Sequence, residues 1–180
     1  MGAMTRYFDA LETRSADQRA ADLARALPQL IARAQATSGL GRSLSGVDAG
    51  AITAVEALAA LPVLRKSALV AAQAEQPPFG GFAALRAAEF EHIFQSPGPI
   101  YEPGRASADW WRLGRFLTAS GVGRGDIVQN CFSYHLVPAG TMFENGARAV
   151  GAAVLPAGTG QTDLQVRAAR DVGSTVYAGT

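Results

Sequence analysis

The sequence has little of several residue types on which whole classes of proteins depend. Cys131 is the only cysteine in 180 residues, so no disulfide can form within the chain, and nothing requires an oxidising compartment. This cysteine and the two histidines, His92 and His135, show no spacing typical of metal ligands. No apolar run approaches the roughly 20 residues that a membrane-spanning helix needs, and the N-terminus does not resemble a signal peptide. We therefore expect a cytoplasmic protein without a metal site and without a membrane partner.

The sequence has no cluster of basic residues of the kind that nucleic-acid binding needs. The 16 basic residues nearly balance the 15 acidic ones, and Lys66 is the only lysine. Trp110 and Trp111 could form a stacking platform for bases, but no basic cluster accompanies them. We favour packing in a helix for this pair and expect no nucleic-acid partner.

What is present is the composition of an ordinary globular protein, with 48% hydrophobic and 17% charged residues. A chain of this length buries about 70% of the surface that its unfolded form exposes. The core therefore needs no disulfide or metal to be stable.

The first part of the chain, residues 1–88, has helical patterns. Ser15 and Gln18 have the spacing of a capping box, which predicts that a helix begins here. Pro28 falls inside the apolar repeat that follows, so we expect it to kink or split this helix. Short helices are expected after Thr53 and Ser67, each of which could cap one.

The second part, residues 89–180, alternates between strand and helix patterns. Segments this far apart need crossover helices, so the strands should be parallel and the crossovers right-handed. The sequence therefore predicts an α/β fold, with a helical N-terminal segment before a mostly parallel β-α-β-α-β sheet. The expected strands are 89–95, 126–132, 152–156 and 174–180, and the expected helices are 107–121, 138–152 and 162–173.

Ligands of such sheets bind at the carboxyl ends of the strands. "CFSYH" and "PAGTGQT" lie at two of these ends. The first could wall a substrate pocket or simply pack in the core. The second could cradle an anion at a helix N-terminus or form only a tight turn. We interpret Cys131 as a buried structural residue, because its spacing from His135 gives no specific catalytic geometry.

The segment "HIFQSPGPIYEPGR" (92–105) lies between an expected strand and an expected helix, where many folds place a phosphate-binding loop. It has three prolines and an acid but no lysine. Ser96 and Gly98 could keep a residual phosphate contact, or the segment could be a rigid turn set by its prolines.

Several motifs, in this order and spacing, resemble those of the phenylacetate–CoA ligases, a family of adenylate-forming enzymes. The match covers the chain from about Ser15 onward. Its strongest parts are "GRGDIVQN", "CFSYH", "LPAGTGQTDLQ" and "TVYAGT", and "ALAALPVLRKSAL" resembles an earlier family segment. The resemblance implies that residues 89–180 are the first part of the AMP-binding N-terminal domain, and that the chain is the front part of a longer protein.

The resemblance also implies an activity: an acid, ATP and CoA give acyl-CoA, AMP and pyrophosphate, with Mg²⁺ on the phosphates. The catalytic lysine of the family lies outside this segment, so we expect no catalytic residue here and no activity from this chain alone. Phe132, Tyr134, His135 and Gly158 occupy positions expected to line the pocket of a small carboxylic acid, with an aromatic acid as one candidate. A homodimer is a candidate assembly.

The chain departs from the family at the phosphate loop, where SSGTTGKP becomes "SPGPIYEP". Ser96 and Gly98 match, but Glu102 replaces the lysine, and Pro97 and Pro99 lack N–H groups that would hold phosphate. As written, this loop is a poor phosphate binder. The alternative function is therefore a catalytically degenerate relative that acts as a binding or scaffold protein without ATP chemistry.

Overall fold

The C-terminal part of the chain forms the parallel sheet that the sequence predicts. In the computed structural model, which describes residues 7–180, three parallel strands have the order β4–β3–β5. The central strand is β3 (Ile127–Asn130), flanked by β4 (Ala153–Pro156) and β5 (Val176–Ala178). The predicted mixed α/β fold with a parallel sheet is confirmed.

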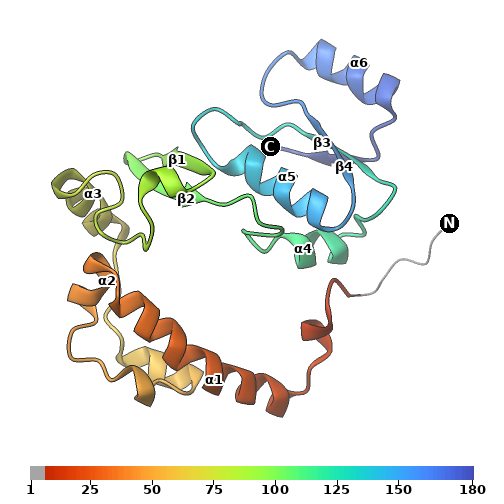
Figure 1. Cartoon of the computed structure of the whole chain (residues 1–180). Helices are drawn as coiled ribbons and strands as arrows, with labels where there is room; N and C mark the ends of the chain where they lie inside the picture. Colours follow the sequence, from red (N-terminus) through yellow and green to blue (C-terminus); the bar gives the residue numbers. More distant parts are fainter. Residues whose placement is uncertain (1–6) are drawn as a thin grey trace. The chain divides into compact units, whose positions relative to one another are not determined.

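The two crossover helices, α5 (Ala139–Ala149) and α6 (Thr162–Val172), lie on opposite faces of this sheet (Figure 1). The faces differ because successive side chains of a strand point to opposite sides. Val128 packs in the cluster beneath α5, whereas the neighbouring Gln129 donates a hydrogen bond from Nε2 to the backbone oxygen of Gln165 on α6 (3.1 Å).

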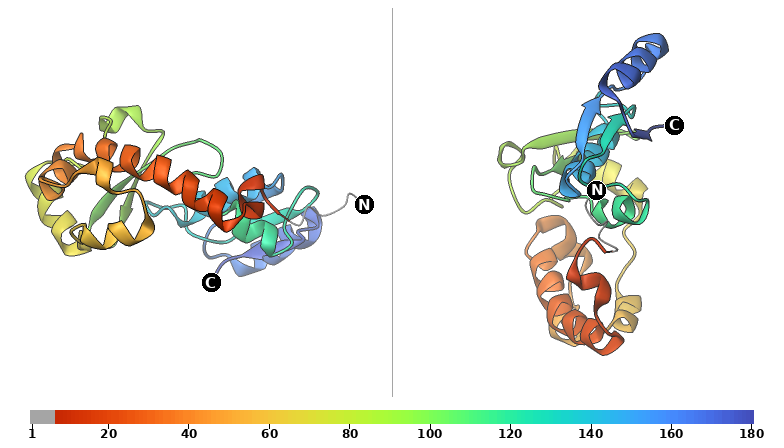
Figure 2. Two further views of the ribbon diagram at one scale, coloured as in Figure 1. Left: turned by 90° about the horizontal axis from the view of Figure 1, so that it is seen from below. Right: turned by 90° about the vertical axis from the view of Figure 1, so that its right-hand side faces the viewer.

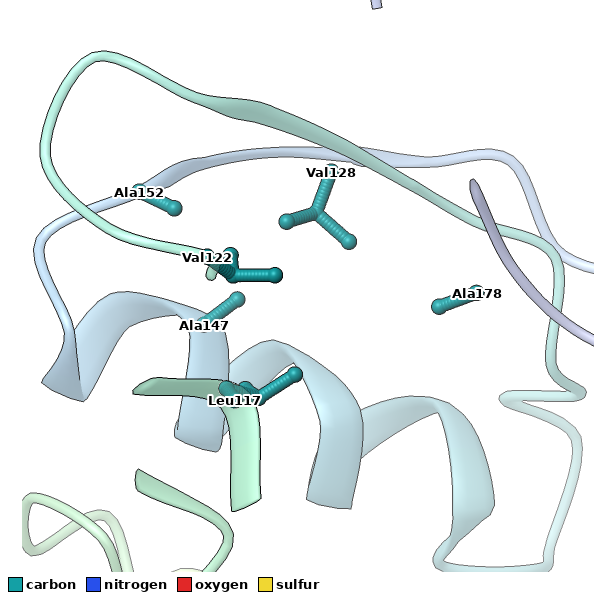
Figure 3. Close-up of a cluster of buried hydrophobic side chains, with 6 residues drawn as sticks. All are labelled: Leu117, Val122, Val128, Ala147, Ala152 and Ala178. Atoms are coloured by element: carbon teal, nitrogen blue, oxygen red, sulfur yellow. The ribbon is translucent and has the colours of Figure 1, made fainter. Parts of the chain in front are cut away.

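The core between the sheet and α5 is built from small and medium side chains (Figure 3). The small residues of α5 let the helix approach the strands closely, and Ala147 has no exposed surface. The buried members of this core are Leu117, Val122, Val128, Ala147, Ala152 and Ala178.

The helix expected over residues 107–121 is shorter, because α4 covers only Gly114–Ala119. The preceding segment turns instead. Asp109 and Arg112 have φ angles of 53° and 59°, which a right-handed helix excludes. The carboxylate of Asp109 accepts a hydrogen bond from the Gly114 N–H (2.8 Å). This acid, which precedes α4, therefore pairs with a backbone N–H in the first turn of the helix.

The chain divides into two compact units. The first comprises the described residues 7–13, Phe94–Ser96 and Gly104–Thr180, and the second comprises Arg14–Ile93 and Pro97–Pro103. The sheet, α4, α5 and α6 belong to the first. The domain boundary placed between residues 88 and 89 from the sequence stays a prediction.

The second unit begins with α1 (Ala16–Gln35), whose capping box is formed as predicted. Ser15 Oγ accepts from the Gln18 N–H (3.1 Å), and Gln18 Oε1 accepts from the Ser15 N–H (2.9 Å). The expected split at Pro28 is wrong, because α1 continues through the proline as one helix (Figure 2). Its flanking neighbours Leu27 and Ile31 are buried, so packing on both sides of the proline offsets the lost hydrogen bond.

The other helices of this unit are short. α2 (Ser38–Ser43), η3 (Val55–Ala60) and α3 (Lys66–Glu75) follow α1. Neither η3 nor α3 has a side-chain cap, so the caps predicted at Thr53 and Ser67 are wrong. The remaining 3₁₀ helices of the described chain are η1 (Ala10–Thr13), η2 (Ala49–Ala51) and η4 (Ala87–Glu89).

The segment expected to join a strand to a helix joins two strands instead. β1 (His92–Ser96) and β2 (Ile100–Gly104) form a separate two-stranded sheet. Ser96 ends β1, Gly98 lies exposed in the turn, and Glu102 lies in the middle of β2. The strand expected at residues 89–95 therefore starts later, because its first residues belong to η4 and a bend.

Within residues 7–180, no helix combines the length and apolarity needed to cross a bilayer.

Candidate functional site

The carboxyl end of β3 leads into the aromatic segment that the sequence singles out as a substrate wall. Asn130 ends the strand and has no exposed surface. Its side chain bridges two parts of the loop that follows: Nδ2 donates to Tyr134 Oη (2.8 Å) and to the Gly140 backbone oxygen (2.7 Å). Oδ1 accepts from the Phe132 N–H (3.2 Å). A fully buried amide thus organises the turn from β3 into α5.

Tyr134 is held by this amide and by α5. Its ring lies so close to Gly140 that a methyl group there would be 2.7 Å from the ring carbons. Its hydroxyl accepts a hydrogen bond from Asn130, and the Glu144 carboxylate of α5 lies nearby. Burial of the hydroxyl and the nearby Glu144 carboxylate together raise the pKa of Tyr134 well above its ordinary value, although the Asn130 hydrogen bond opposes this. Tyr134 stays a protonated phenol at neutral pH.

Phe132 faces the protein interior more than any pocket. Its ring stacks on Phe143 of α5, with the centroids 4.4 Å apart and the planes 25° from parallel. Both rings pack against the buried cluster beneath the sheet. Phe132 is partly buried and contributes to core packing, one of the two interpretations left open by the sequence.

His135 lies exposed on the loop between β3 and α5. Its backbone N–H donates to Ser133 Oγ (3.2 Å), and its backbone oxygen accepts from the Val137 N–H (2.8 Å). These bonds place the imidazole beside the aromatic segment but on its solvent side.

Gly158 belongs to the glycine-rich loop after β4. Like Tyr134, it is hydrogen-bonded to Asn130 at the end of β3. Its N–H donates to the backbone oxygen of Asn130 (2.9 Å). Its own backbone oxygen accepts from Gln165 Nε2 (2.9 Å), which also reaches the Gly160 oxygen (2.7 Å). Because the Gly158 N–H already donates to Asn130, it is not available as a donor to a ligand.

The start of α6 differs from expectation, because Thr162 is its first residue rather than its cap. The cap position is Gln161, which has a left-handed backbone (φ 52°) and makes no side-chain hydrogen bond to the helix.

Cys131 is buried, as expected, and its thiol donates to Gln165 Oε1 (3.1 Å). Gln165 therefore fastens both the glycine-rich loop and the end of β3.

In the second unit, Tyr101 and Glu102 of β2 line a cavity of about 480 Å³. Gln73 of α3 is almost fully buried and fixes this strand: its amide donates to the Tyr101 oxygen and accepts from the Tyr101 N–H, both at 2.8 Å. The lining is mainly apolar, with Leu69, Phe79, Phe82 and Ile100 among its members and Lys66 and Glu102 as its charged groups.

The turn between β1 and β2 has few donors for a phosphate. Pro97 and Pro99 lack N–H groups, and the charged residues that line the cavity are Glu102 and Lys66. No group of three acidic, histidine or cysteine side chains within residues 7–180 could hold a metal ion.

Sequence reasoning missed Asn130 and Gln165, whose side chains hydrogen-bond to the aromatic segment, and Glu144, whose carboxylate lies near Tyr134. A signal for Asn130 was available, since it is a polar residue at the carboxyl end of an otherwise buried strand. Glu144 and Gln165 lie on helices, where nothing in the local sequence shows which side faces the loop.

The fold of this chain is similar to part of the fold of solved CoA ligases. Three solved structures of 2-hydroxyisobutyryl-CoA ligase, in complex with its acyl-AMP intermediates and in one case CoA, each cover 100% of this chain and 40–42% of their own. Their TM-scores are 0.83, 0.86 and 0.84 at 22–23% sequence identity.

The resemblance to phenylacetate–CoA ligases expected from the motifs is also confirmed. The chain is 29% identical to the phenylacetate-coenzyme A ligase of Thermus thermophilus over 143 residues. The match spans 76% of this chain and 31% of the relative, so the chain corresponds to about a third of that protein. No family model matches the sequence.

Proposed function

We propose that the chain is the N-terminal part of an AMP-forming ligase that joins a small carboxylic acid to CoA. The similarity to phenylacetate-coenzyme A ligase over 143 residues carries this proposal. The shared fold over the whole chain supports it. The overall reaction converts an acid, ATP and CoA to acyl-CoA, AMP and pyrophosphate.

In this proposal the chain supplies one wall of the acid pocket, and no catalytic group. Tyr134 contributes its ring, Gly158 the shape of the neighbouring loop, and His135 a polar rim. Phe132 supports the wall from behind through its stack on Phe143. We propose a cytoplasmic location, and an aromatic acid as the first substrate to test.

Acid-dependent exchange of pyrophosphate into ATP tests the proposal. The full-length product of the gene is incubated with Mg²⁺, labelled pyrophosphate, ATP and a panel of aryl and alkyl acids. We expect exchange with at least one acid, and formation of its CoA thioester when CoA is added. The 180-residue chain alone is the matched control, in which we expect no exchange.

Absence of exchange with every acid, together with no heat of ATP binding in calorimetry, would overturn the ligase proposal. It would instead support the catalytically degenerate binding protein, for which the prolines and the carboxylate of the β1–β2 turn are the argument. Glu102→Lys adds a second comparison. If Glu102 faces nucleotide phosphate, the variant binds ATP more tightly, and Glu102→Gln, which removes charge without adding any, gives an intermediate affinity.

A further inference from the structure

We propose that Asn130 is the positioning residue of the acid pocket: by holding the Tyr134 hydroxyl, it turns the carbon surface of the ring, and not its hydroxyl, toward the substrate. This inference rests on the proposed function. It assigns a role to a residue that touches no substrate itself.

The first observation is that three of the four residues expected at the pocket are hydrogen-bonded to Asn130. The side chain binds Phe132 N–H and Tyr134 Oη, and the backbone oxygen binds the Gly158 N–H (2.9 Å). Asn130 has no exposed surface, so these bonds are shielded from competing water. A single residue therefore fixes both segments that would meet the acid.

The second observation concerns the direction of the Tyr134 hydroxyl. Its oxygen accepts a hydrogen bond from Asn130 Nδ2 at 2.8 Å. Because Asn130 has no exposed surface, this bond directs the hydroxyl into the protein. The carbon surface of the ring is therefore what remains for a substrate, and a hydrocarbon body can pack on it.

The third observation is that the ring cannot easily leave this orientation. Gly140 lies against it so closely that even a methyl group would be 2.7 Å from the ring carbons. Gly140 is held in turn from both sides, because its N–H donates to the Ser133 oxygen (2.8 Å) and its oxygen accepts from Asn130 Nδ2 (2.7 Å). Tyr134 remains half-buried, so the rest of the ring stays accessible.

The test measures KM and kcat for phenylacetate in pyrophosphate exchange, with the full-length product of the gene. Asn130→Ala removes the amide that holds the Tyr134 hydroxyl. Tyr134→Phe removes that hydroxyl and keeps the ring. We expect each variant to raise KM for the acid about tenfold, the worth of one hydrogen bond to a buried partner, with little change in kcat. Because both act through one contact, the double variant should raise KM no further than the larger single effect.

Gln129→Ala is the matched control. It removes an equally buried amide from the neighbouring position of β3, but this side chain faces α6 and makes no contact with Tyr134. A general loss of stability would change KM in both Asn130→Ala and Gln129→Ala. Loss of positioning would change KM only in Asn130→Ala. We expect KM for phenylacetate to be unchanged in Gln129→Ala.

The outcomes separate the inference from the function on which it rests. Exchange by the wild type with an unchanged KM in Tyr134→Phe overturns the inference and leaves the ligase proposal standing. This holds even if Asn130→Ala does not fold, because Tyr134→Phe keeps the ring and its packing. Additive effects in the double variant overturn it too, since they would show that Asn130 acts by another route. No exchange by the wild type overturns both.

Discussion

Tyr134 is a residue whose protonation depends on the fold. Its pKa is raised by burial and by the Glu144 carboxylate, so the folded chain holds this proton more tightly than the unfolded chain does. Below about pH 10, the ordinary pKa of tyrosine, both states are protonated and the free energy of unfolding is unaffected. Above it, the unfolded chain loses the proton first, so stability falls as pH rises.

We therefore predict that the difference in unfolding free energy between the wild type and Tyr134→Phe is constant from pH 7 to about 9 and shrinks above about pH 10. Urea unfolding at a series of pH values measures this difference directly. Tyr177→Phe is the control, because it removes the hydroxyl of a side chain that is largely exposed. A Tyr134→Phe difference that stays constant to pH 11 would contradict the proposed surroundings of the hydroxyl.

At the residue scale, the sequence predicts local contacts well and distant ones poorly. The Ser15–Gln18 capping box was predictable because both hydrogen bonds join residues three apart. The aromatic segment was placed correctly at a strand end. Asn130, Glu144 and Gln165 were not found, because their partners become neighbours only after the strand and two helices have packed.

At the scale of elements, the predicted order of strands and helices in the sheet is correct, but several bounds differ. The helix expected at residues 107–121 is shortened to α4 because Asp109 and Arg112 adopt left-handed backbone angles, which no local pattern announces. α1 runs through Pro28 without the expected split, because burial on both sides of the proline outweighs its cost. In the second case tertiary packing decided against local propensity.

The packing of α4 on α5 gives a prediction at this scale. Gly146 lies inside α5, where alanine would be favoured by about 1 kcal/mol from helix propensity alone. The added methyl, however, would lie 2.7 Å from Leu113 Cβ and 3.1 Å from Leu117 Cδ1. We expect the clash to win, so that Gly146→Ala lowers the unfolding free energy by about 1–3 kcal/mol in urea titration.

Gly123→Ala is the control for this substitution, because nothing lies within 4 Å of an added methyl there. Its unfolding free energy should stay within about 0.5 kcal/mol of the wild type. A stabilised Gly146→Ala would show that α4 can move away from α5 at little cost, contrary to the tight contact described above.

At the scale of the whole molecule, the α/β class and the likeness to CoA ligases could be predicted, whereas the interleaving of the two compact units is visible only in the structure. The motifs carry the likeness because their order and spacing survive in the sequence. The units are interleaved, since Phe94–Ser96 groups with the sheet while Pro97–Pro103 groups with the helices. A linear scan for composition changes cannot detect a boundary that the chain crosses repeatedly.

Each unit has its own buried cluster, which leads to a prediction for unfolding. Leu27 is buried in the cluster of α1 in the second unit, and Leu117 in the cluster beneath the sheet in the first. Trp110 and Trp111, the only tryptophans, both belong to the first unit. Tryptophan fluorescence therefore follows the first unit, while circular dichroism is dominated by helices that include the long α1 of the second.

We predict that Leu27→Ala costs about 2–5 kcal/mol in the second unit alone. The midpoint of the circular dichroism transition in urea should fall, while the midpoint of the fluorescence transition stays at its wild-type value. Leu117→Ala is the reciprocal variant and should lower the fluorescence midpoint. If Leu27→Ala instead lowers both midpoints equally, the two clusters unfold as one cooperative system, and the separate stability that we infer from their separate cores is wrong.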